Sequence, residues 1–142
     1  MTTRVLAVGV DLIETKRIAE VLDRFGERFL RRVYTEGELA YANGRIAALA
    51  TRWAAKEATA KALGTGIGAV NFNDIEVVCG RNGKPELVLR DRAAQLAADL
   101  NMQQFALSLS HTRHYAVAYV IAQGQSQEPL DFAQQIDFSL EG

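Results

Sequence analysis

The spacing of apolar and polar residues along the chain predicts a mixed helix and strand fold. Val5–Val10 is a short run rich in β-branched residues, which predicts a buried strand. Apolar residues then recur at helical spacing over Glu14–Arg32, with a break or bend near Gly26. Thr35–Glu38 fits a capping box, so a short helix should begin there. A longer helix, over Ile46–Leu63, should follow it.

The second half of the chain has strand character with one helix. Four short runs predict strands, and they are Ile75–Cys79, Glu86–Leu89, Phe105–Ser110 and Tyr115–Ala122. A turn at Asn82-Gly83 should separate the first two strands. The short connection between the last two predicts an antiparallel hairpin. Arg92–Leu100 predicts a helix, with Asp91 as its cap.

Composition narrows the class of protein. With 142 residues, 49% of them hydrophobic and 23% charged, the chain fits one soluble domain. A formal net charge of −1 argues against a general nucleic-acid-binding surface. No apolar run is long enough for a membrane span, and the first residues lack a signal-peptide core, so we expect a cytoplasmic protein. The single cysteine, Cys79, excludes an intrachain disulfide, and we expect it to be a small buried residue of a strand.

The last twenty residues differ from the rest of the chain. Residues 123–142 contain four acidic side chains, five glutamines and no lysine or arginine. We therefore expect a domain over residues 1–122 and an acidic C-terminal tail over residues 123–142.

The most informative stretch is Thr51–Gly68, which comprises the second part of the long helix and the glycine-rich loop after it. Glu57 and Lys61 lie four residues apart and so share a helix face. Gly64 and Gly66 should end the helix and leave backbone free to approach a ligand. A purely structural alternative is an exposed helical ion pair, which contributes about 0.3–0.5 kcal/mol, followed by glycine caps.

Other residues with chemical potential lie at predicted strand ends. Asp11 follows the first strand in apolar surroundings, where it is either a turn cap or a metal ligand. Both histidines, His111 and His114, fall in the hairpin turn, without the spacing of a zinc site. His111 directly follows a strand and is the better candidate to face a cleft. Trp53 is expected in the core or at a subunit contact.

The first predicted helix carries more basic than acidic residues on its polar face. Its basic residues are Lys16, Arg17, Arg24, Arg28, Arg31 and Arg32, and its acidic residues are Glu20, Asp23 and Glu27. This face is either simply solvated or a docking surface for an acidic partner.

Three motifs together resemble one family. GVDLIETKRI near the start, RWAAKEATAKALGTGIG in the middle and LSLSHT near the end occur in an order similar to that of the holo-acyl-carrier-protein synthases, the small bacterial 4′-phosphopantetheinyl transferases. The resemblance spans about Val5 to Ala122. It implies an α+β fold in which a small antiparallel sheet packs against a long central helix. It also implies transfer of phosphopantetheine from coenzyme A to a serine of an apo acyl carrier protein, with release of 3′,5′-ADP, in fatty acid or polyketide biosynthesis.

The resemblance assigns roles to individual residues. Asp11 and Glu57 match the family's magnesium ligands, and Glu57 and Lys61 match its catalytic positions. Coenzyme A should contact Arg52, Lys61, Gly64, Gly66 and His111, and the carrier protein should dock on Arg17, Arg24 and Arg28. Glu57 and a metal-bound water are both candidates for the base that accepts the serine proton.

Family members of this type are typically trimers, so the resemblance implies a homotrimer with active sites between subunits. Two other hypotheses compete with this one. A non-catalytic binding module would predict no magnesium dependence and no loss of function in Glu57→Gln. A different magnesium-dependent phosphate enzyme, such as a nucleotide phosphohydrolase, would require more acidic ligands near Asp11 or Glu57 than the sequence supplies.

Overall fold

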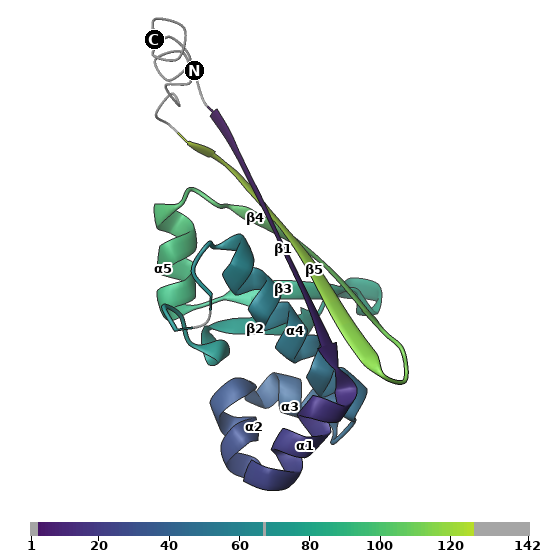
Figure 1. Ribbon diagram of the computed structural model, residues 1–142. Helices are drawn as coiled ribbons and strands as arrows, with labels where there is room; N and C mark the ends of the chain where they lie inside the picture. Colours follow the sequence, from purple (N-terminus) through teal and green to yellow (C-terminus); the bar gives the residue numbers. More distant parts are fainter. Residues whose placement is uncertain (1–2, 67, 127–142) are drawn as a thin grey trace, which may run out of the picture.

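The computed structural model describes residues 3–66 and 68–126 and has an α+β architecture (Figure 1). The described residues form five α-helices and five strands, and in chain order they are β1 (Thr3–Glu14), α1 (Thr15–Phe25), α2 (Glu27–Val33), α3 (Glu36–Ala42), α4 (Ile46–Ala62), β2 (Ile75–Cys79), β3 (Pro85–Leu89), α5 (Asp91–Asp99), β4 (Gln104–His111) and β5 (Tyr115–Ser126). Two short 3₁₀ helices, η1 (Phe72–Asp74) and η2 (Arg81–Gly83), flank β2. The predicted fold class is confirmed.

A three-stranded antiparallel sheet and the long helix α4 form the centre of the molecule. The strand order is β1-β5-β4, and β2 and β3 form a separate two-stranded antiparallel sheet. On β5, Ala116, Ala118, Val120 and Ala122 are fully buried on the side that faces α4. In Figure 1, β1 crosses α4, while α1, α2 and α3 gather beside the N-terminal part of α4.

The opposite face of the central sheet is apolar and exposed. Side chains alternate between the two faces of a strand, so every second residue of β1 points away from α4. Large exposed apolar residues of β1 and β5 share this face, and they are Leu6, Val8, Val10, Leu12, Tyr115, Tyr119 and Ile121. An exposed apolar patch of this kind marks an interaction surface.

Several predicted elements form as the sequence indicates. Gly26 separates α1 from α2, with a positive φ of 56°. Thr35 and Glu38 make the capping box of α3, and Asn43 ends that helix in the left-handed conformation. The hairpin of β4 and β5 is confirmed, although β5 runs to Ser126 and so includes residues 123–126 of the predicted tail. Residues 127–142 lie outside the described part, and the division into domain and tail stays a prediction.

Two local predictions are wrong, and one of the two alternatives for Asp11 is excluded. Asp11 lies inside β1, opposite Ala118 of β5, and is not a turn cap, because the strand continues three residues beyond it. Cys79 is exposed, because β2 is buried over its first three residues and leaves the core at its last residue. Arg90 occupies the N-cap position of α5, and Asp91 is the first residue of the helix.

None of the helices within residues 3–66 and 68–126 is long and apolar enough to cross a membrane.

Candidate active site

Gly9 allows β1 to approach α4 at backbone distance. A Cβ atom placed on Gly9 would lie 1.8 Å from the carbonyl oxygen of Ala58, so no other residue fits without moving the helix. The alanines along this side of α4 have the same effect, because they add little bulk between helix and strand. This close crossing brings the side chain of Asp11, two residues after Gly9, to the level of Glu57 and Lys61.

Asp11, Glu57 and Lys61 form one charged cluster at the crossing. The Lys61 ammonium donates to the Val10 carbonyl oxygen at 2.9 Å and to Asp11 Oδ1 at 3.2 Å. The structure therefore contains no Glu57–Lys61 ion pair, because the Lys61 ammonium contacts β1 instead. Partial burial raises the pKa of Glu57, and the negative charge of Asp11 raises it further, while Lys61 opposes both effects.

The cluster fits a magnesium site by its donor set. Two carboxylates stand close enough to repel each other, with one lysine to balance them, so an added cation is favoured there. Magnesium in proteins is commonly held by one or two carboxylates, with water and substrate phosphates completing its coordination. No group of three or more His, Cys, Asp or Glu side chains suitable for a metal occurs among residues 3–66 and 68–126.

Lys56, beside Glu57 in the sequence, is a buried structural lysine. Its ammonium is fully buried and donates to Glu38 Oε1 at 2.7 Å, to the Phe72 carbonyl at 3.1 Å and to the Ile75 carbonyl. Glu38 also accepts from the backbone N–H of Val77 at 3.0 Å, so the pair ties α4 to α3 and β2. Burial lowers the pKa of Lys56, and Glu38 opposes that shift.

Sequence reasoning missed this pair. It assigned Glu38 only to the capping box, a role that the structure confirms. It placed Lys56 beside Arg52 on the helix and predicted no acidic partner for it. The sequence did contain one signal, a lysine within a run of alanines. Alanine side chains are small and allow close packing, so a charge among them is buried and needs a buried partner.

Arg52 and His111 meet in a second site, on another side of α4. They line a pocket of about 560 Å³, here called the arginine pocket, whose other lining residues are Tyr41, Arg45, Ile46, Ala47, Ala48, Thr51, Cys79, Gly83, Pro85 and Leu109. The Arg52 guanidinium lies 4.1 Å from the Tyr41 ring centroid and donates to Thr51 Oγ1 at 3.0 Å. Its Nε atom is buried without a hydrogen-bond partner. A buried unpaired donor is costly, so the pocket suits an anion.

The two predicted halves of the site are not brought together within one chain. Arg52 and Lys61 are nine residues apart, which at about 100° per residue places them on opposite sides of α4. The arginine pocket contains none of the cluster residues Asp11, Glu57 and Lys61. Within one copy of the chain, the predicted site residues therefore form two separate groups.

Gly64 and Gly66 end α4 through their own backbone. Their φ values are 78° and 68°, which explains why glycine is needed at both positions. The N–H of Gly64 donates to the Lys61 carbonyl at 3.0 Å, and the N–H of Gly66 donates to the Ala60 carbonyl at 3.4 Å. Both amide N–H groups are used to cap the helix and are therefore not free for a ligand. At each glycine, only the position that a Cβ atom would occupy is open, because no atom lies within 4 Å of it.

The residues expected to dock a carrier protein lie on the surface of α1 and α2. Arg17, Arg24 and Arg28 are all exposed, on α1 and α2. Phe25, the last residue of α1, is 50% exposed. Beside it is an apolar hollow of about 450 Å³, lined by Val21, Phe25, Arg28, Phe29, Arg32, Val33, Trp53 and Phe72. Trp53 is half buried there and stacks on Phe72 with ring centroids 4.8 Å apart.

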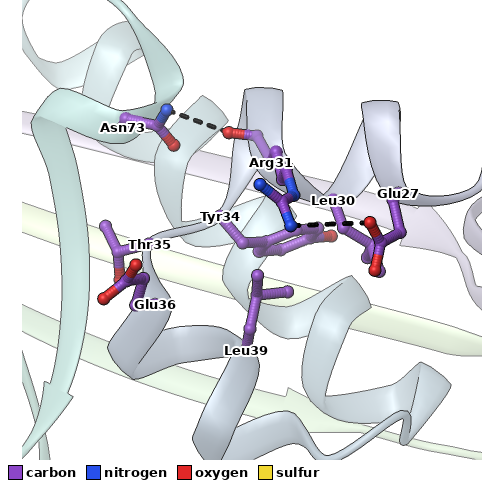
Figure 2. Close-up of a pocket in the computed structure, with 8 residues that line it drawn as sticks. All are labelled: Glu27, Leu30, Arg31, Tyr34, Thr35, Glu36, Leu39 and Asn73. Carbon is purple, nitrogen blue, oxygen red and sulfur yellow. Dashed lines mark hydrogen bonds and ion pairs between the residues drawn. The ribbon is translucent and has the colours of Figure 1, made fainter.

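A further hollow of about 480 Å³ lies between α2 and α3 (Figure 2). Its polar groups are largely occupied within the chain. Arg31 pairs with Glu27 at 3.6 Å, Asn73 donates to the Arg31 carbonyl at 3.2 Å, and Tyr34 donates its hydroxyl to the Leu49 carbonyl at 2.8 Å. We therefore assign it no ligand.

Known proteins share this architecture. A crystal structure of Helicobacter pylori holo-[acyl-carrier-protein] synthase in complex with coenzyme A superposes with a TM-score of 0.75 at 29% identity, covering 81% of this chain and 98% of that one. A crystal structure of a Bacillus anthracis holo-(acyl-carrier-protein) synthase in complex with CoA (3′,5′-ADP) gives a TM-score of 0.71 at 37% identity, covering 86% of this chain and 99% of that one.

Sequence comparison agrees with the fold. Over 116 residues the chain is 50% identical to the holo-[acyl-carrier-protein] synthase of Carboxydothermus hydrogenoformans. This match covers 80% of this chain and 94% of that protein. Residues 7–120 match the 4′-phosphopantetheinyl transferase superfamily. The chain belongs to this superfamily, and both its predicted resemblance to the holo-acyl-carrier-protein synthases and the prediction of an enzyme of this class are confirmed.

Proposed function

We propose that this protein transfers the 4′-phosphopantetheine group of coenzyme A to a serine of an apo acyl carrier protein, with magnesium, and releases 3′,5′-ADP. The observation that carries the proposal is the cluster of Asp11, Glu57 and Lys61, held together where β1 crosses α4. Coenzyme A as substrate is supported by the relatives whose structures contain it. The proposed location is the cytoplasm, and fatty acid or polyketide biosynthesis is the proposed setting.

Each part of the cluster has a role in the proposed reaction. Asp11 and Glu57 would hold a magnesium ion, which neutralises charge on the pyrophosphate when it is bound. The Lys61 ammonium, with its side chain 52% exposed, can turn from Asp11 to the transferring phosphate. Phosphoryl transfer depends mainly on positioning and on neutralising spread negative charge. The carrier protein supplies the serine nucleophile, so this chain needs no nucleophile of its own. Glu57 is one candidate base for the serine proton.

We infer that the functional form is a homotrimer with its active sites between subunits. Two observations support this inference. The central sheet exposes an apolar face that includes Leu6 and Leu12, which are 68% and 64% exposed. The cluster and the arginine pocket lie on different sides of α4, so a neighbouring copy would be needed to bring Arg52 and His111 opposite Asp11 and Glu57. In this arrangement Arg52 and His111 would bind phosphates of coenzyme A.

The carrier protein would dock at the exposed end of α1. Arg17, Arg24 and Arg28 would face its acidic surface, and the apolar hollow beside Phe25 would accept an apolar side chain. A charged rim around an apolar centre is the usual arrangement of a protein interface.

The test is the mass of an apo acyl carrier protein incubated with the full chain, coenzyme A and magnesium, with an EDTA control. We expect a gain of about 340 Da, one phosphopantetheine arm in a phosphoryl-type transfer, only when magnesium is present. A gain that persists in EDTA would contradict the metal assignment. If a folded sample modifies no carrier protein, the binding-module hypothesis is favoured.

The trimer has its own test, by analytical ultracentrifugation of the unmodified chain and of Val8→Asp. Val8 lies on the exposed apolar face, so a carboxylate there should prevent assembly without disturbing the core. A fully active monomer would contradict a site that is completed by a neighbouring copy.

A further inference from the structure

Cys79 presents an accessible thiol on the wall of the arginine pocket. It is the last residue of β2, it pairs across the small sheet with Pro85, and its side chain is exposed. Both residues line the same pocket as Arg52 and His111. It is also the single cysteine of the chain.

The pocket itself points to an anionic occupant. Its lining includes two arginines, Arg45 and Arg52, and no carboxylate. Arg52 is only 6% exposed, and its Nε atom has no hydrogen-bond partner. Both guanidinium groups lie close to the ring of Tyr41, at 4.1 Å for Arg52 and 5.0 Å for Arg45 from the ring centroid. A small anion that enters this pocket therefore comes close to the Cys79 thiol.

We propose that Cys79 is a modification site coupled to the arginine pocket, at which a small anionic disulfide such as oxidised glutathione forms an adduct that excludes the pocket's own ligand. The step is thiol–disulfide exchange. The Cys79 thiol loses its proton to solvent, and Sγ attacks one sulfur of the disulfide. A new S–S bond forms as the old one breaks, and the other half leaves as a thiolate.

Two consequences distinguish this site from a merely exposed thiol. The chain has no second cysteine that could attack the adduct, so reversal requires an external thiol. The pocket holds about 560 Å³, so a tripeptide adduct fills much of it, whereas a methylthio group leaves most of it open. The loss of ligand binding should therefore depend on the size of the adduct.

The experiment compares three forms of the full-length protein: untreated, treated with oxidised glutathione, and treated with methyl methanethiosulfonate. Intact mass gives the number of adducts, and calorimetry gives the affinity for 3′,5′-ADP. We expect one glutathione per chain, a slower reaction when 3′,5′-ADP is present, and an affinity lower by roughly tenfold or more. Dithiothreitol should restore the affinity, and the methylthio form should stay close to its untreated control. Cys79→Ser, measured against its own untreated sample, should take up no adduct.

The choice of 3′,5′-ADP as probe rests on the proposed function, and the two can fail separately. If the untreated protein does not bind 3′,5′-ADP, the proposed function is contradicted, and the same protection and affinity measurements are made with pyrophosphate. If the glutathione adduct leaves the affinity unchanged, or the bound anion does not slow its formation, the coupling is refuted. A disulfide between two copies, seen on a non-reducing gel in place of the adduct, also refutes it.

Discussion

Lys56 and Lys61 lie five residues apart on α4 and have opposite surroundings. The Lys56 ammonium is fully buried, with Glu38 and two backbone carbonyls as its acceptors. The Lys61 side chain is 52% exposed, and its ammonium contacts Asp11 at 3.2 Å. All three donors of the Lys56 ammonium are occupied by acceptors within the fold. The Lys61 ammonium can leave Asp11, because it remains in contact with solvent.

The difference teaches how one helix separates stability from chemistry. A buried pair such as Lys56–Glu38 is costly to break, because the remaining charge has no water to solvate it. An exposed pair such as Lys61–Asp11 contributes little to stability. Lys56 can thus fix the helix against α3 and β2 while its neighbours Glu57 and Lys61 stay available for the proposed reaction.

The largest effect should follow from removing a carboxylate of the cluster. Glu57→Gln and Asp11→Ala each take away one of two expected magnesium ligands, so transfer to the carrier protein should fall to background while the fold persists. Activity measured across a magnesium titration, with circular dichroism to check folding, tests this expectation. Glu36→Gln, an exposed glutamate on α3, is the matched control. Activity near that of the unmodified chain at limiting magnesium would rule out the metal assignment.

Lys56→Met should destabilise the protein most. It leaves the Glu38 carboxylate buried and the Phe72 and Ile75 carbonyls without their donor, at a cost of about 3–5 kcal/mol in the free energy of unfolding. Urea unfolding measures the change. The double variant Lys56→Met with Glu38→Gln should recover part of the loss, because neither position then carries a buried, unpaired charge. A single variant as stable as the unmodified chain would show that the pair does not hold α4 in place.

Lys61→Met should separate activity from stability. We expect the unfolding free energy to change by less than about 1 kcal/mol. The turnover number should drop on the order of a hundredfold, as when one donor to a transition-state oxyanion is removed. Lys16→Met removes another exposed lysine, paired with Glu20 at 3.8 Å, and serves as the control. If both variants keep full turnover, Lys61 does not contact the transferring phosphate.

Arg17→Glu should have the smallest effect, confined to the partner protein. Reversing one charge at a docking rim should weaken carrier binding roughly tenfold, equal to about 1.4 kcal/mol. Affinity for coenzyme A should not change. Arg92→Glu, on α5, is the control for a change of net charge. Equal losses for both ligands would mean that α1 is not a dedicated docking face.

Local structure was largely predictable from the sequence, because its causes are local. The break at Gly26, the capping box of Thr35 and Glu38, and the extent of α4 all depend on residues within a few positions of one another. Glu57 and Lys61 were recognised as one helix face for the same reason. The motif residue Gly9 was noted only as part of a resemblance, and its physical role emerged from the contact with Ala58.

What could not be predicted depends on partners that are distant in the sequence. Lys61 pairs with Asp11, fifty residues away, in place of the nearby Glu57. The alanines around Lys56 indicate a buried lysine, but no local pattern identifies Glu38, Phe72 and Ile75 as its acceptors. Cys79 has an apolar strand-like neighbourhood, yet it ends its strand at the rim of a pocket. The separation of Arg52 from Lys61 around α4 was implicit in their spacing, but the significance of that spacing depends on where β1 and β4 run.

The pairing of β1 with β5 also determines how the molecule can be handled. Thr3 and Ser126 are register partners, while Glu14 and Tyr115 pair at the other end of the same two strands, where α1 begins. The Thr3 end of β1 therefore lies at the far end of this strand pair from α1 (Figure 1). A tether attached at Thr3 would hold the protein on a sensor surface with α1 directed outward, available to a partner in solution.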